Sequence, residues 1–447
     1  MRSAAVAFRG SAFETRQMPR GRLPARNGRL AILVGLLLVL AAACTSEPQP
    51  RDLPDVDLGP TSGPSTASPS GEPAPTIASD VSALTGRLAV LDAAGNLVAV
   101  NPDGSGEVVL AEIEPGTSQI RQPTWSPDGS RVAWVLVEAA EDEMQAAVVA
   151  TSTDRGTRPT EATTGVVPFY LSWDPTSSRI AYLGGREMEV ELGIVEAGRG
   201  RGTTLETGQP FYLSWAPGGD QLLVHVGEDR LERLGLDGSL ATVAERPGTF
   251  FAPVWTTDGR TFVYASAEEN GQRLVVHDAG ERAGRALVAF DGLVRFIVSP
   301  DGRRVAFQVL ERESALPLTV IDVRTGEMVE IVEGITGGFF WSPDGERLLY
   351  LTPDPDEERF WYRWGVWDGT SSFTTARFLP SLVVVQEYLP FFEQYAQSMS
   401  LWSPDGSAFV YPGENEAGER GIWIQSVEPD RGPVLVADGT FVAWSPE

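Results

Sequence analysis

The chain has 447 residues, of which 42% are hydrophobic, so it is long enough and apolar enough to bury a sizeable core. Its 61 acidic residues outnumber its 35 basic ones, and the resulting net charge of −26 argues against binding to nucleic acids or anionic lipid faces. The 47 glycines and 33 prolines indicate many turns, and the single cysteine excludes a disulfide framework.

Residues 1–43 are typical of an export signal. They are rich in arginine and end in an apolar run that begins at Leu30. The run is shorter than the roughly twenty residues that a membrane-spanning helix needs. Met1 and Met18 both remain possible starts, and Met18 would give a basic region of more usual length.

The end of the apolar run, "LAAAC", resembles the lipobox of bacterial lipoproteins. In that family the signal is cut before the cysteine, which then carries lipid. The resemblance implies lipidation at Cys44, although Ala41 stands where the usual motif has Leu. An ordinary secretory signal followed by an incidental cysteine is the alternative. An exported chain that keeps one cysteine uses it for something other than an internal disulfide.

Residues 44–84 consist largely of Ser, Thr, Pro and acidic residues. Such a composition cannot bury enough apolar surface to fold, so this segment is predicted to be a disordered tether. Together, the signal and the tether predict a protein anchored by lipid to the outer face of the cytoplasmic membrane, or held in the periplasm or cell envelope.

One phrase, "WSPDG", recurs through residues 86–447 with small variations. Each copy predicts a β-hairpin: a strand that ends in the anchor residue, a Ser-Pro-Asp-Gly turn and a second strand. The anchors lie 40 to 48 residues apart, with one interval of 61. They are Trp125, Trp173, Trp215, Trp255, Val298, Trp341, Trp402 and Trp444.

The stretches between anchors supply two further strands per unit, as in "RLVVHD" and "RALVAF". Four short strands every 40 to 50 residues predict an all-β protein, a β-propeller. Eight anchors predict eight blades, with seven as the alternative if one unit is degenerate. The chain ends after an inner strand and begins, beyond the tether, with three strands that lack one. The two ends are therefore predicted to complete one blade and close the ring.

The repeat resembles that of TolB-type propellers, the WD-repeat-like units of bacterial envelope proteins. The resemblance covers residues 86–447 and implies the propeller fold. It is not specific for function, because such propellers serve as scaffolds, binding modules and enzyme domains. TolB carries an additional N-terminal domain where this chain has a tether, so the resemblance does not imply a role in the Tol system.

The loops that lead into the inner strands are unusually aromatic, and in a propeller they gather on one face around the central channel. They could form a rim that stacks on sugars or grips apolar side chains, or they could pack between blades. The predicted binding residues of these loops are Phe169, Tyr170, Phe211, Tyr212, Phe250, Phe251, Phe339 and Phe340.

The long interval contains an insertion at about residues 378–400, predicted to emerge on the same face. It is too apolar for disorder and could form a lid over the channel or a docking surface. A local brace over one blade is the alternative. Its predicted binding residues are Tyr388, Phe391, Phe392 and Tyr395.

Evidence for catalysis is weak. The chain has only two histidines, His225 and His277, and no nucleophile elbow, phosphate loop or zinc motif. We therefore predict no catalytic residues, no metal and no cofactor. Acidic pairs such as Asp354 and Asp356 are expected to be solvated loop charge, and the recurring Asp of the repeat is explained by turn chemistry.

These observations predict a binding module for a protein partner or an envelope glycan. The propeller is expected to be monomeric. The rival function is a glycan hydrolase or lyase that uses carboxylates at the channel mouth. Geometry distinguishes the two: an enzyme needs two carboxylates that converge, whereas a binding module needs only an apolar or aromatic patch.

Overall fold

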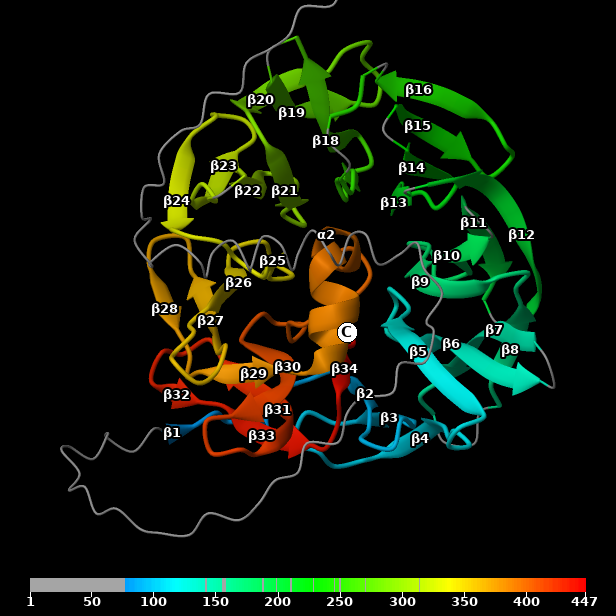
Figure 1. Cartoon of the computed structure of the whole chain (residues 1–447), viewed down its shortest axis with the longest axis vertical. Coiled ribbons are helices and arrows are strands. Elements are labelled where there is room, and N and C mark those ends of the chain that lie inside the picture. Colours follow the sequence, from blue (N-terminus) through cyan, green and yellow to red (C-terminus); the bar gives the residue numbers. More distant parts are fainter. Residues whose placement is uncertain are drawn as a thin grey trace, which may run out of the picture.

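The computed structural model describes residues 77–447, apart from 141–142, 155–157, 187–188, 198, 210, 228, 245, 249–250, 270 and 313. The predicted signal, Cys44 and most of the predicted tether lie outside these residues. Within the described part of the chain, the strands form eight antiparallel blades around a central axis, and two pairs of neighbouring blades are joined edge to edge into eight-stranded sheets (Figure 1). The predicted all-β propeller is confirmed.

The first four blades are formed mostly by consecutive strands. Blade 1 contains β34 (Phe441–Trp444), β2 (Leu88–Leu91), β3 (Leu97–Val100) and β4 (Val108–Ala111). Blade 2 contains β5 (Ser118–Trp125), β6 (Arg131–Ala140), β7 (Glu143–Ser152) and β8 (Thr160–Thr163). Blade 3 contains β9 (Val167–Trp173), β10 (Arg179–Arg186), β11 (Glu189–Glu196) and β12 (Arg199–Gly208). Blade 4 contains β13 (Phe211–Trp215), β14 (Gln221–Val226), β15 (Arg230–Gly235) and β16 (Leu240–Ala244).

The remaining blades follow in chain order. Blade 5 contains β17 (Val254–Trp255), β18 (Thr261–Glu268), β19 (Gly271–Asp278) and β20 (Arg285–Phe290). Blade 6 contains β21 (Leu293–Val298), β22 (Arg304–Leu310), β23 (Leu318–Asp322) and β24 (Met328–Val332). Blade 7 contains β25 (Gly338–Trp341), β26 (Leu348–Pro353), β27 (Tyr362–Trp367) and β28 (Ser372–Thr374). Blade 8 contains β30 (Ala408–Asn415), β31 (Arg420–Ser426) and β33 (Val434–Ala437).

Blade 8 differs from the others because the insertion precedes it. The insertion contains β29 (Phe378–Pro380), the π-helix η2 (Val384–Tyr388), the 3-10 helix η3 (Leu389–Phe391) and α2 (Phe392–Tyr395). β29 pairs with both β27 and β30 and so joins blades 7 and 8. The inner strand of blade 8 is reduced to one bridge, between Trp402 and Phe409.

The ring closes as predicted, because β34 from one end of the chain pairs with β2 from the other, from Leu88 opposite Trp444 onwards. A second contact lies further out, where β1 (Ile77–Ala78) pairs with β32 (Arg431–Gly432) at blade 8. The described chain therefore contacts the propeller from Ile77 onwards, within the segment that composition assigns to the tether.

The recurring tryptophan connects neighbouring blades. The indole N–H of Trp125 donates to the carbonyl of Ala443, the residue before the anchor of blade 1, at 3.0 Å. We call this bond the tryptophan latch. The same bond recurs in four other blades. It joins the indole N–H groups of Trp173, Trp215, Trp341 and Trp402 to the carbonyls of Thr124, Ser172, Ile297 and Phe340, in that order. Blade 6 has Val298 at this position, and the buried indole nitrogen of Trp255 has no hydrogen-bond partner among the described residues.

The Ser-Pro-Asp-Gly turn is held by its own side chains, as predicted from turn chemistry. In blade 2 the carboxylate of Asp128 accepts from the Ser126 hydroxyl at 2.6 Å and from the Ser130 N–H at 3.0 Å. Gly129 has a φ of 64°, which a residue with a side chain rarely adopts. Burial alone would raise the pKa of Asp128, but the hydrogen bonds from Ser126 and Ser130 outweigh it and lower the pKa.

Candidate functional site

The insertion fills the central channel. Its helical part lies across the middle of the ring in Figure 1, inside the inner strands. We call residues 381–400 the plug. The spacing of Tyr388, Phe392 and Tyr395 at i, i+4 and i+7 matches one helix face and is visible in the sequence. Pro390, which lacks an N–H, lies in the short 3-10 turn between η2 and α2.

The plug forms bonds or ring contacts with every blade, whereas a local brace would contact one blade only. Towards blades 1 and 8, Ser381 donates from its hydroxyl to Thr440 and from its N–H to Pro412. Towards blades 2 to 5, the bonds join Ser398 to Thr124, Gln394 to Tyr170 and Leu213, and Gln397 to Pro253. Towards blades 6 and 7, the ring of Phe392 lies against Arg295 and Phe339.

Gln394 is the most completely bonded residue of the plug. Its side-chain oxygen accepts from the N–H of Leu213, and its amide group donates to the carbonyl of the same residue, both at 2.8 Å. The amide also donates to the Tyr170 hydroxyl at 2.9 Å. Leu213 lies on β13, whose channel-facing edge has no neighbouring strand, so Gln394 satisfies backbone groups that would otherwise be buried without partners.

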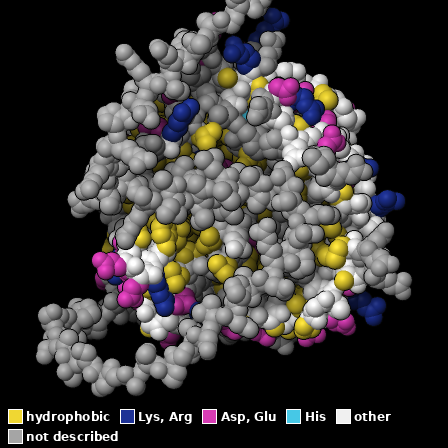
Figure 2. All heavy atoms as spheres, viewed as in Figure 1, with side chains coloured by type: hydrophobic (Ala, Val, Ile, Leu, Met, Phe, Trp, Pro, Cys, Tyr) yellow, Lys and Arg dark blue, Asp and Glu magenta, His cyan; other side chains and the backbone are white. Residues whose placement is uncertain are grey.

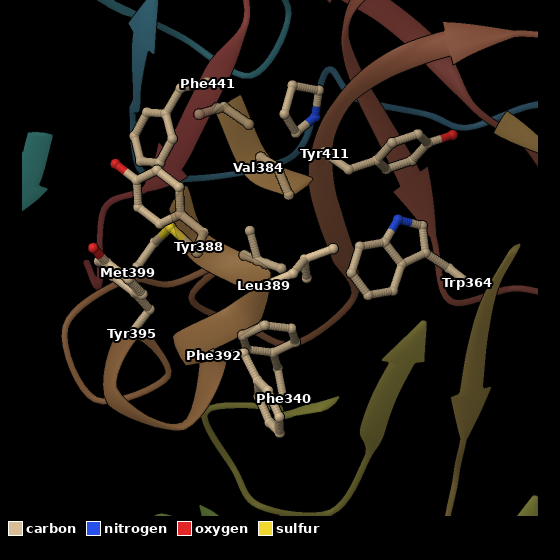
Figure 3. Close-up of a pocket in the computed structure, with 13 residues that line it drawn as sticks. Phe340, Trp364, Val384, Tyr388, Leu389, Phe392, Tyr395, Met399, Tyr411 and Phe441 are labelled. Carbon is tan, nitrogen blue, oxygen red and sulfur yellow. The ribbon is translucent and has the colours of Figure 1, made fainter. Parts of the chain in front are cut away.

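Aromatic packing fills the rest of the channel mouth. Tyr388 stacks on Phe441 with ring centroids 4.8 Å apart, and Phe392 meets Phe339 at 4.7 Å. Figure 3 shows Tyr388 and Phe441 on one side of a small apolar void, with Trp364 opposite. The void measures about 20 Å³, which leaves no room for a ligand larger than a water molecule.

The predicted binding residues are mostly packed together. Eight of them are buried: Tyr170, Phe211, Phe251, Phe339, Phe340, Tyr388, Phe392 and Tyr395. Tyr212 and Phe391 are half-buried, and Phe169 is 44% exposed. Phe250 lies outside the described residues. The eight buried residues are packed inside the protein, and a binding role for the set stays a prediction.

Two buried ionisable residues of the channel, Glu393 and Arg295, influence each other electrostatically. Burial raises the pKa of the Glu393 carboxyl, and the positive charge of Arg295 lowers it in part. The guanidinium of Arg295 lies 4.9 Å from the ring centroid of Phe392 and donates to the Thr336 carbonyl at 2.7 Å. This arrangement joins the plug to blade 6 and does not supply a pair of carboxylates.

The acidic residues near blade 7 form ion pairs. Asp354 binds Arg363 at 2.6 Å, and Asp356 binds Arg377 at 3.3 Å. Figure 2 shows acidic and arginine side chains together at the lower left, where Figure 1 places β27 and β29. Among the described residues, no group of three or more acids, histidines or cysteines is placed to hold a metal ion. These carboxylates are held by arginines rather than simply solvated.

The other end of the channel is open. A cavity of about 380 Å³, which we call the funnel, lies where the inner strands finish and their turns begin. The last residues of the plug, from Ala396 to Ser400, form part of its wall. The site predicted from the sequence lies at the opposite end of the channel, where the inner strands begin. The tryptophan and proline of the repeat itself were the signal for this second opening.

No family model and no curated protein matches the sequence. Solved structures do match. A eukaryotic initiation factor is 11% identical with a TM-score of 0.50, over 81% of this chain and 98% of that chain. The chain has the β-propeller fold.

Two further structures have lower scores. TolB from Acinetobacter baumannii is 15% identical with a TM-score of 0.39, over 70% of this chain and 82% of that chain. An oligogalacturonate lyase in complex with manganese is 15% identical with a TM-score of 0.46, over 68% and 84%. No helix in the described part of the propeller is both long and apolar enough to cross a membrane.

Proposed function

We propose that the protein is a lipid-anchored, extracytoplasmic member of the TolB-type propellers that binds a protein partner or an envelope glycan. The observation that carries the proposal is that the channel mouth is filled by the chain's own plug. A propeller enzyme that works at this mouth needs space for a substrate between its catalytic groups. Here that space is occupied by Phe392, Tyr388 and Gln394.

The rival function, a glycan hydrolase or lyase, has less support. A glycosidase needs two carboxyl groups about 5 to 10 Å apart across an open site. Glu393 interacts electrostatically with Arg295, and Asp354 and Asp356 are each paired with an arginine. None of the 22 described residues that line the funnel is charged. The two openings of the channel therefore offer packing surfaces rather than acid–base groups.

The anchor in this proposal rests on Cys44 and the composition of the segment that follows it. Fully extended, residues 45–76 would reach at most about 110 Å, enough to hold the propeller away from a membrane surface. Several acyl chains on one cysteine would make such an anchor stable.

The proposal is tested with the full-length chain expressed in a bacterium that processes lipoproteins. The wild-type chain should incorporate radiolabelled fatty acid and sediment with membranes, and Cys44→Ala should do neither. Purified envelope glycans incubated with the wild-type chain should show no new reducing ends and no unsaturated products. Steady release of either product, or full lipid labelling of Cys44→Ala, would overturn the corresponding half of the proposal.

A further inference from the structure

We infer that the funnel binds an uncharged segment of a protein partner that carries proline or aromatic side chains. This inference rests on the proposed binding function and narrows it, because it selects a protein over a glycan. It also places the contact at the end of the channel opposite the aromatic loops, on a surface formed by the repeat itself.

The wall of the funnel is uncharged among the described residues. In the whole chain 21% of residues are charged, whereas none of the 22 described lining residues is. Five prolines from the Ser-Pro turns contribute to the wall, together with five tryptophans. They are Pro127, Pro300, Pro343, Pro404 and Pro446, with Trp125, Trp173, Trp341, Trp402 and Trp444. An uncharged wall of this kind favours an uncharged occupant, because a charged group would lose its hydration without gaining a partner.

Several polar groups of the wall are already engaged in hydrogen bonds within the protein. The carbonyl of Ser398 accepts from Thr124 at 2.8 Å, and that of Ser400 accepts from the Trp444 N–H at 2.8 Å. The amide of Gln397 donates to Pro253. The lining indoles donate to backbone carbonyls, as those of Trp125 and Trp173 do in their latches. A sugar brings several hydroxyl groups, and each one that is buried without a hydrogen-bond partner weakens binding. An apolar segment requires no such partners.

The size and rigidity of the funnel also suit a short segment of a protein partner. The 380 Å³ of the funnel lie at the lower end of the range of about 300 to 1,000 Å³ seen for ligand pockets. The space suits a few side chains on a projecting segment, and proline-rich segments dock in aromatic-lined grooves with little loss of entropy. The turns that form the rim are held by bonds such as Ser342 to Asp344, so little ordering is needed on binding.

Val298 widens the funnel on one side. It lines the funnel at the position where the other repeats carry tryptophan, and it is half-buried. A tryptophan at this position would occupy space in the funnel. Val298→Trp is therefore a blocking variant that introduces the residue found at the same place in the other blades.

The test is selection from a phage-displayed library of random linear peptides on the full-length chain. Enriched peptides should be uncharged and rich in proline or aromatic residues. Pro343→Glu and Val298→Trp should each weaken their binding at least tenfold. The matched control is Pro217→Glu, which changes the same turn position in blade 4 but lies outside the funnel lining. Pro217 is half-buried and Pro343 exposed, so the control is the harder change for the fold.

Several results would overturn the inference. Enrichment of charged peptides would do so, as would equal weakening by Pro217→Glu, with folding of each variant checked by its melting temperature. If a synthetic peptide of residues 59–71 displaces the selected peptides most effectively, the occupant is this chain's own segment and not a partner. If Pro343→Glu still binds a purified partner or glycan as the wild type does, the funnel assignment fails while the proposed binding function stands.

Discussion

The tryptophan latch can be tested by comparing two anchors that differ in one hydrogen bond. Trp125 and Trp255 occupy the same place in their blades and are 6% and 7% exposed. Trp125→Phe and Trp255→Phe remove the same atoms from similarly buried sites. Only Trp125 loses a bond, because its indole N–H donates to Ala443 whereas that of Trp255 has no described partner.

The expected difference follows from the cost of an unmade hydrogen bond. Packing loss is common to both variants and largely cancels in the comparison. Trp125→Phe also removes the indole bond to the buried carbonyl of Ala443, which stays opposite Ala89 in the sheet, and this loss should cost about 1 kcal/mol more. Trp255→Phe removes a buried donor that has no partner, which should reduce its cost by up to about 1 kcal/mol. The free energies of unfolding of the two variants should therefore differ by about 1 to 2 kcal/mol.

Guanidinium unfolding of the full-length chain, followed by circular dichroism, gives the difference as a shift of midpoint. Trp402→Phe, whose latch reaches Phe340 at 3.2 Å, should behave like Trp125→Phe. If Trp255→Phe lowers the midpoint as much as the other two, the latch contributes nothing and the repeated tryptophan acts through packing alone.

Two further predictions concern buried polar groups. Gln394→Leu leaves both backbone groups of Leu213 without partners, so the free energy of unfolding should fall by about 2 to 4 kcal/mol. The control Gln397→Leu loses one 3.3 Å bond and should cost about 1 kcal/mol. Urea titration measures both losses, and equal losses would contradict the role of Gln394. Burial lowers the pKa of His225 to about 4, so the unfolded chain binds more protons below about pH 6.5 and stability should fall as the pH drops from there to about 4. Between about pH 6.5 and 4, the free energy of unfolding of His225→Gln should fall by about 3 kcal/mol less than that of the wild type. Unfolding midpoints that depend on pH equally in the two proteins would refute this.

The repeat was readable because its chemistry is local. The carboxylate of Asp128 accepts hydrogen bonds from Ser126 and Ser130, which are two residues away on either side. The same short sequence therefore forms the same turn in each blade that contains it. Counting the anchors gave eight blades, and the incomplete units at the two ends gave the closure of β2 on β34. These features depend on hairpins and on strand number, which a single sequence displays.

The site depended on contacts that no local pattern contains. Gln394 binds Leu213 across 181 residues and Tyr170 across 224, and these bonds draw the insertion into the channel instead of over it. The aromatic loops were visible in the sequence, but the plug residues that pack on Tyr170, Phe339 and Phe340 come from a distant part of the chain. The uncharged funnel at the other end likewise arises only when turns from separate blades meet around one axis, because closing the ring, and not any single repeat, places those prolines and tryptophans together.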